Sequence, residues 1–222
     1  MRVGFVCKGA LGAYKKSQGD SMDDALHPSV LVVGFNGLGE VSYEQELSGE
    51  TRCFEEVATL SKLQKSVVVC GCITNARGHR RKSAIVAEQG RLVGVSDALH
   101  AIDGEVASGA TLRVYETGVG KMGVVVAEDL AFPETVKTLA ACGSDFIVCP
   151  FGRVASVHTS LVCAHAYCFG VPLFFCGDGA CMIADTAGNI AFSSQQSPVA
   201  VDFEWGKEYR LVQTRQRGLF GV

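Results

Sequence analysis

A buried strand that runs almost directly into a helix is the feature that most constrains the fold of this chain. Residues 122–126 form a continuous apolar run typical of a buried strand, and Pro133 with Glu134 favours the first turn of a helix. The sharp turn between them begins Ala127-Glu128-Asp129. Strand-to-helix turns of this kind present one side chain to a pocket, as nucleophile elbows do. Here that side chain is the methyl group of Ala127, which cannot act as a nucleophile.

Apolar runs of strand length recur along the chain, and segments with helical spacing lie between some of them. Strands are expected at residues 1–7, 30–34, 67–73, 83–87, 91–96, 112–115, 122–126, 145–149, 172–176, 180–185 and 190–192. Helices are expected at residues 50–65, 134–142 and 158–169, with at most a short helix at 21–27. Turn residues at 89–90, 118–120 and 186–189 predict hairpins. Strands joined by both hairpins and helices predict an α/β (α+β) chain with mixed sheets.

The composition predicts one domain over residues 1–222. Hydrophobic residues make up 48% of the chain, which is enough to bury a sizeable core, and no linker is visible. The formal net charge is −3 and the basic residues are dispersed, which argues against nucleic acid or an anionic membrane as a partner. The local basic clusters at residues 15–16 and 79–82 are expected to be solvated turns.

The cysteines and the first residues of the chain predict a cytoplasmic location. The apolar run in residues 1–8 is too short for a signal peptide and is interrupted by Lys8. No stretch is long enough to span a membrane. The ten cysteines are expected to be reduced and to serve mostly as small apolar fillers.

The turn segment has a close counterpart in a known family. Residues 123–134 resemble the Gly-x-x-x-Cys-x-Asp-x-x-Phe-Pro-Glu elbow of the nitrilase superfamily, the carbon-nitrogen hydrolases. Residues 118–123, 141–150 and 161–170 are also similar, and residues 182–188 resemble the Ile-Ile-Asp-Pro-x-Gly hairpin of the superfamily. This resemblance runs over nearly the whole chain. It implies an α-β-β-α sandwich, in which two stacked mixed β-sheets carry helices on their outer faces.

The resemblance also implies where a catalytic triad would lie. Members of the superfamily attack amide and nitrile carbons with a cysteine, use a glutamate as general base and stabilise the oxyanion with a lysine. The elbow aligns Ala127 with the cysteine. Residues 90–100 resemble Gly-x-Leu-Val-Gly-x-Tyr-x-Lys-x-His, which aligns Ala98 with the lysine. Residues 31–43 resemble the segment of the base, which aligns Asn36 with the glutamate, and Glu40 is nearby. We therefore expect that none of the three catalytic positions is intact.

Several residues around the triad are retained in this alignment. Glu105 aligns with a second pocket glutamate that helps to orient the lysine, and His100, Asp129 and Glu134 are also kept. A buried Glu105 without its cationic neighbour would have a raised pKa or would bind a cationic group, so we expect a small amide or amine ligand. The residues expected to line the binding site are Glu105, Glu128, Cys149, Phe151 and Cys176. Cys149 and Cys176 are alternative nucleophiles or buried fillers, and Phe151 is a core or lining aromatic.

Two other ligand sites are not expected. His158, Cys163, His165 and Cys168 fall in one expected helix, but only the two histidines share a face closely, so we expect no metal. The segment Gly118-Val119-Gly120-Lys121 lacks the spacing of a phosphate-binding loop and is expected to be a hairpin turn. No cofactor is expected.

Three functional hypotheses remain. The first is a pseudoenzyme that has lost the covalent mechanism and has a small-molecule-binding or assembly role. The second is an active amide or nitrile hydrolase with relocated groups, or with water activated by Glu105 or Glu128. The third is structural: superfamily members commonly dimerise through helices that match residues 134–142 and 158–169, so the partner is a second copy or a paralogue.

Overall fold

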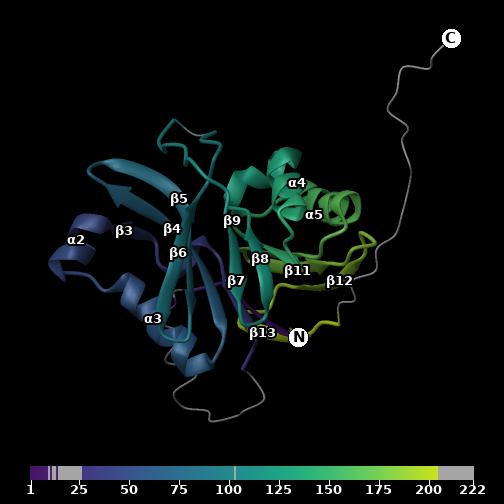
Figure 1. The fold of residues 1–222 in the computed structure, drawn as a ribbon, viewed down its shortest axis with the longest axis horizontal. Helices are drawn as coiled ribbons and strands as arrows, with labels where there is room; N and C mark the ends of the chain where they lie inside the picture. Colours follow the sequence, from purple (N-terminus) through teal and green to yellow (C-terminus); the bar gives the residue numbers. More distant parts are fainter. Residues whose placement is uncertain (10, 12–13, 15–26, 103, 205–222) are drawn as a thin grey trace.

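Two β-sheets lie face to face in this chain and carry helices on their outer sides (Figure 1). The computed structural model describes residues 1–9, 11, 14, 27–102 and 104–204. In Figure 1, α2 (Tyr43–Ser48) and α3 (Cys53–Gln64) lie on one side of the sheets, and α4 (Pro133–Ala141) and α5 (Ser156–Phe169) lie on the other. This arrangement confirms the expected α-β-β-α sandwich.

The first sheet combines parallel and antiparallel strands. Its order is β13 (Val199–Asp202), β1 (Arg2–Val6), β2 (Val30–Val33), β4 (Val67–Ala76), β5 (His79–Glu88) and β6 (Arg91–Asp97), with β3 (Glu40–Ser42) paired to β4. Strands β1, β2 and β4 are parallel, and β4, β5 and β6 form an antiparallel meander. Such mixed pairing is what the combination of hairpins and helices in the sequence predicted.

The second sheet has a parallel centre. Its order is β12 (Ile190–Ser194), β11 (Ala180–Ala184), β10 (Leu173–Asp178), β9 (Phe146–Arg153), β8 (Gly120–Val124) and β7 (Val114–Thr117). The central strands β8, β9 and β10 are parallel, so the segments that follow β8, β9 and β10 all emerge at the same end of this sheet.

Side chains alternate between two packed layers along the central strands. On β9, Phe146 and Val148 belong to the core between the two sheets, whereas Ile147 and Cys149 belong to the core under α4 and α5. This period of two is the geometry of a strand that is buried on both faces. A third cluster packs α3 against the first sheet.

The structure corrects the expected start of β5. The sequence placed the basic residues 79–82 in a solvated turn, but all four belong to β5, and the turn is formed instead at Arg77 and Gly78 with φ angles of 52° and 82°. The continuous buried run of β5 begins only at Ser83, so the charged first part of the strand carries no hydrophobic signal.

Other elements differ in smaller ways. The short elements β3, α2 and β13 were not predicted, and they contain few of the apolar repeats that mark longer elements. The short helix expected at residues 21–27 and the basic pair at 15–16 fall essentially outside the described residues. Within the described part of the chain, no helix is long and apolar enough to cross a membrane.

Candidate functional site

The strand-to-helix turn is strained at the residue where a nucleophile elbow presents its side chain. After β8 the chain enters the short 3-10 helix η3 (Ala127–Ala131), and Ala127 has a φ of +50°. A non-glycine residue in this left-handed region costs about 1–2 kcal/mol. Such strain persists where the surrounding structure holds it, and it is common at functional sites. The Ala127 methyl group is almost fully buried.

Asp129 fastens the loop that carries Ala98 to this turn. Its carboxylate, which is 1% exposed, accepts hydrogen bonds from the backbone N–H groups of Leu99 at 2.7 Å and His100 at 2.9 Å. The His100 ring nitrogen Nδ1 lies 2.8 Å from the same carboxylate, and the ring stacks on Phe132 at 3.6 Å between centroids. The elbow and the loop after β6 are therefore held as one unit.

This clamp brings two of the aligned triad positions into the same core. Ala98 and Ala127 are both buried in the cluster between the sheets, and Phe35 packs against that cluster. The third position, Asn36, is in the 3-10 helix η2 (Phe35–Gly37) that follows β2. A side chain built at Gly34 would meet the carbonyl oxygens of Phe151 and Cys176 at 3.6 Å, so η2 begins beside the ends of β9 and β10. All three positions thus lie where strands β2 and β8 to β10 end.

A lysine from a neighbouring strand enters the site. Lys82 Nζ on β5 donates to Glu128 Oε1 at 2.6 Å, and the two side chains are only 19% and 30% exposed. The backbone N–H of Ala98 donates to the carbonyl oxygen of Lys82 at 2.8 Å. A cation therefore stands one strand away from the position that the resemblance aligned with a lysine.

Sequence reasoning missed Lys82 because it treated residues 79–82 as solvent-exposed. The two arginines of this run also pair with carboxylates of other strands: Arg80 pairs with Glu40 at 3.2 Å, and Arg81 pairs with Asp97 at 3.9 Å. Extending the predicted strand 83–87 backward by one residue would have placed Lys82 within the sheet. The signal was present, but only through the strand period.

Glu105 occupies an open groove rather than a buried pocket. It is exposed, and it lines a groove of about 490 Å³ together with Arg80 and Lys82. The expectation that Glu105 is buried without a cationic neighbour is therefore wrong. The groove has Ile73 and Val106 as its apolar wall.

The two candidate cysteines are buried in different layers. Cys149 lies on the helix side of β9, and burial, with the charges of Asp129 and Glu128, raises its pKa well above the usual value. Cys176 lies between the sheets and donates from Sγ to the carbonyl oxygen of Val6 at 3.5 Å, and burial raises its pKa as well. A raised pKa disfavours the thiolate that a nucleophile needs.

Phe151 packs beneath the second sheet, with its ring centroid 5.2 Å from that of Phe175 and 4.4 Å from that of His158. The structure therefore does not bring Phe151, Cys149 and Cys176 into the groove with Glu105. It joins Glu128 to that groove through Lys82.

The histidines of α5 have other partners. His165 Nε2 lies 2.8 Å from the carbonyl oxygen of Leu130, and His158 Nδ1 accepts the backbone N–H of Ala155 at 2.8 Å. Among the described residues, no group of three or more His, Cys, Asp or Glu side chains has the arrangement of a metal site. The segment Gly118 to Gly120 is the turn between β7 and β8, as its spacing predicted.

Comparison with known proteins identifies the family. The carbon-nitrogen hydrolase family model matches residues 28–201. The chain belongs to the carbon-nitrogen hydrolase family. A probable nitrilase from Schizosaccharomyces pombe is 26% identical over 133 residues, which cover 55% of this chain and 48% of that protein. The chain thus spans about half the length of this curated relative.

Solved structures of nitrilase-superfamily proteins share the fold. A Nesterenkonia amidase in which a cysteine is mutated to alanine aligns with a TM-score of 0.74 at 17% identity, over 90% of this chain and 88% of that one. A carbon-nitrogen hydrolase from Helicobacter pylori aligns with a TM-score of 0.76 at 15% identity, over 91% and 89% of the two chains. These likenesses confirm the sandwich that the elbow sequence implied for a carbon-nitrogen hydrolase.

Proposed function

We propose that this carbon-nitrogen hydrolase family protein does not use a covalent mechanism and acts instead by binding a small molecule or by assembly. The observation that supports the proposal is the elbow itself. It has a left-handed turn at Ala127 and the Asp129 clamp, but the side chain that it presents is a methyl group. Losing a nucleophile removes orders of magnitude of rate, because triad residues act as a unit.

The groove beside Lys82 and Glu128 is the proposed ligand site. The ammonium of Lys82, which lines the groove, is a donor, and the carboxylate of Glu128, which is hydrogen-bonded to Lys82, is an acceptor. A neutral amide offers a matching carbonyl oxygen and N–H groups. The two cations of the groove are already paired, Arg80 with Glu40 and Lys82 with Glu128, so we propose a neutral small amide as the ligand.

One observation favours a second candidate, an active amide or nitrile hydrolase with relocated groups. Glu128 follows Ala127 directly, and it is only partly exposed and held by Lys82. A carboxylate in this position could accept a proton from an attacking water while a lysine stabilises developing negative charge.

The Glu128→Gln variant separates the two candidates. Ammonia release is measured with a panel of amides and nitriles for the wild type, for Glu128→Gln and for a matched Glu116→Gln control, whose side chain is 83% exposed. The proposed function predicts the buffer rate for all three proteins. Wild-type turnover that only Glu128→Gln abolishes would establish the hydrolase instead.

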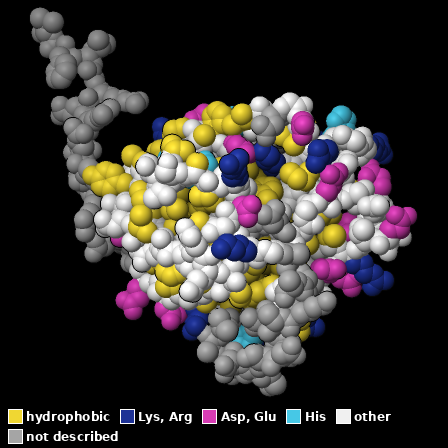
Figure 2. Space-filling model, turned by 180° about the vertical axis from the view of Figure 1, so that it is seen from behind, with side chains coloured by type: hydrophobic (Ala, Val, Ile, Leu, Met, Phe, Trp, Pro, Cys, Tyr) yellow, Lys and Arg dark blue, Asp and Glu magenta, His cyan; other side chains and the backbone are white. Residues whose placement is uncertain are grey.

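The surface of α5 supports assembly. No Asp, Glu, Lys or Arg occurs between residues 154 and 177, and Val157 and Tyr167 of α5 are 55% and 54% exposed. Figure 2 shows more apolar and fewer charged side chains on the half of the molecule that carries α5 than on the half that carries α2 and α3. Exposed apolar surface of this kind marks protein interfaces. We propose that α4 and α5 form the interface of a homodimer or of a pair with a paralogue.

A charge placed on α5 is expected to separate the homodimer. Light scattering after gel filtration should give the wild type twice the chain mass of 23.5 kDa, and Tyr167→Glu a single chain mass, because burying an unpaired carboxylate is costly. The control is Leu47→Glu on α2, a residue that is 87% exposed, and it should leave the dimer intact. A monomeric wild type, or a dimeric Tyr167→Glu, would contradict this interface.

A further inference from the structure

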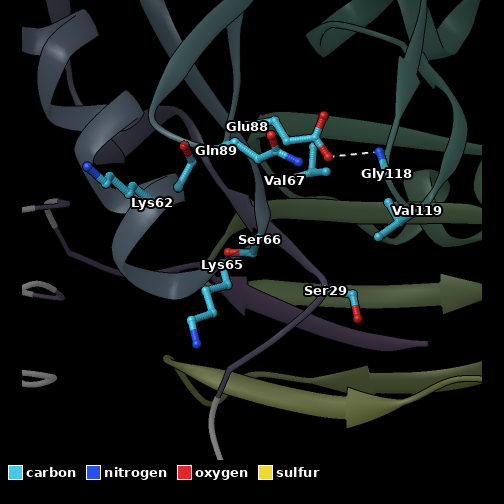
Figure 3. A pocket seen from close by; sticks show the side chains of 10 residues that line it. Ser29, Lys62, Lys65, Ser66, Val67, Glu88, Gln89, Gly118 and Val119 are labelled. Carbon is cyan, nitrogen blue, oxygen red and sulfur yellow. Dashed lines mark hydrogen bonds between the residues drawn. The ribbon is translucent and has the colours of Figure 1, made fainter.

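A second cavity lies at the end of the sandwich away from the elbow. Its volume is about 420 Å³, and its walls come from the start of β4, the end of α3, the β5–β6 turn and the β7–β8 turn (Figure 3). The elbow follows the end of β8, whereas Val119 in this cavity precedes the start of β8. The cavity is therefore separate from the proposed ligand groove.

Two lysines and one glutamate line the cavity, so its lining is net positive among the described residues. Lys62 and Lys65 both line it, and neither forms an ion pair there. This differs from Arg80, Arg81 and Lys82, each of which pairs with a carboxylate. Unpaired ammonium groups beside a cavity attract an anion.

The carboxylate of Glu88 also lines the cavity, and it is hydrogen-bonded to the turn between β7 and β8. Glu88 Oε1 accepts the backbone N–H of Gly118 at 2.8 Å, and Figure 3 shows this pair on the wall across from Lys62 and Lys65. Two backbone carbonyl oxygens in the last turn of α3 also have donors. The Lys65 N–H donates to the carbonyl oxygen of Lys62 at 3.3 Å, and the Ser66 N–H donates to that of Ser61 at 3.1 Å. These acceptors do not compete with a ligand for the two ammonium groups.

Two further features indicate a preformed binding site. The stem of Lys62 packs on the β5–β6 turn, since a side chain built at Gly90 would meet its Cδ at 3.2 Å. Ser66 is 3% exposed, and its hydroxyl has no hydrogen-bond partner. An unsatisfied buried hydroxyl costs about 1–3 kcal/mol, and an acceptor oxygen placed in the cavity would satisfy it.

We propose that this cavity binds the phosphate group of a small phosphate monoester. A phosphate carries close to two negative charges and three acceptor oxygens, which match two lysines and one hydroxyl better than a carboxylate does. In Figure 3 the ammonium groups of Lys62 and Lys65 point away from the middle of the cavity, so binding requires the ends of both side chains to turn inward, which the rotatable bonds of lysine allow. The cavity volume is that of a small-molecule site, so it also holds the organic part of the ester. This inference is independent of the proposed function.

Calorimetric titration with glycerol 3-phosphate tests the site, with glycerol and acetate as comparison ligands at constant ionic strength. The wild type should give saturable single-site binding of the phosphate ester alone. The double variant Lys62→Gln/Lys65→Gln should weaken binding about tenfold or more, because glutamine keeps most of the length of the side chain but removes the charge. Lys8→Gln, an exposed position after β1, is the matched control and should bind like the wild type.

Ser66→Ala provides a readout that does not depend on charge. Removing an unpaired hydroxyl should leave the melting temperature of the ligand-free protein unchanged or raised, and should weaken glycerol 3-phosphate binding about threefold or more. The proposal is overturned if the wild type shows no saturable binding, if acetate binds as tightly, or if the double variant and Lys8→Gln bind equally well.

Discussion

Replacing Asp129 with alanine is expected to lower the free energy of unfolding by about 3–5 kcal/mol. The carboxylate is 1% exposed and accepts the N–H groups of Leu99 and His100, with the His100 ring at 2.8 Å. Without it, these donors lose their acceptor in a site where water has little access. The loop that carries Ala98 would also lose its attachment to the elbow.

Urea unfolding of purified variants measures this effect. Asp129→Asn should lower the free energy of unfolding nearly as much as Asp129→Ala does. An amide keeps one acceptor oxygen, but its NH2 group turns donor hydrogens toward the backbone N–H groups. Asp202→Ala is the control: its side chain is 77% exposed and lies 3.9 Å from Arg2, so its loss should be within about 1 kcal/mol. An Asp129→Ala variant as stable as the control would show that the clamp does not hold the site together.

Valine at position 127 is expected to destabilise the protein by about 2–4 kcal/mol, whereas glycine should stay within about 1 kcal/mol of the wild type. The φ of +50° at Ala127 is unfavourable for any L side chain and worst for a β-branched one. The site is also buried in the core between the sheets, so added methyl groups have little room. Glycine removes the strain of about 1–2 kcal/mol and loses one methyl contact of about 0.8 kcal/mol.

The same unfolding measurement compares the two variants. Ala110→Val, at an exposed loop position, is the matched control for the added methyl groups and should be nearly neutral. Equal losses for Ala127→Val and Ala127→Gly would show that packing, and not the left-handed turn, governs this position.

Much of the fold could be predicted because long apolar strands carry a strong local signal. Strands β4, β9 and β10 and helices α3, α4 and α5 were placed within a few residues, since each has a continuous or periodic apolar pattern. The motif around Ala127 pointed to the family, and with it to two stacked sheets with helices on their outer faces. Short polar elements such as α2 were missed, because their caps at Ser42 and Gly49 define them more than any hydrophobic repeat does.

The candidate site was less predictable because it depends on which face of a strand a side chain occupies. Cys149 was expected at the pocket, yet the register of β9 directs it under the helices. Lys82 was expected in solvent, yet it reaches Glu128 from a strand that is far away in the sequence. A hydrophobic pattern gives the period of a strand, but when both faces are buried it does not say which neighbour each face meets.

The central claim is that this member of the carbon-nitrogen hydrolase family has a preserved elbow without a working nucleophile. The most direct test measures turnover of an amide and nitrile panel by the wild type beside the triple variant Asn36→Glu, Ala98→Lys and Ala127→Cys. We predict ammonia release above the buffer rate only from the triple variant. Clear turnover by the wild type would contradict the claim and would direct attention to Lys82 and Glu128.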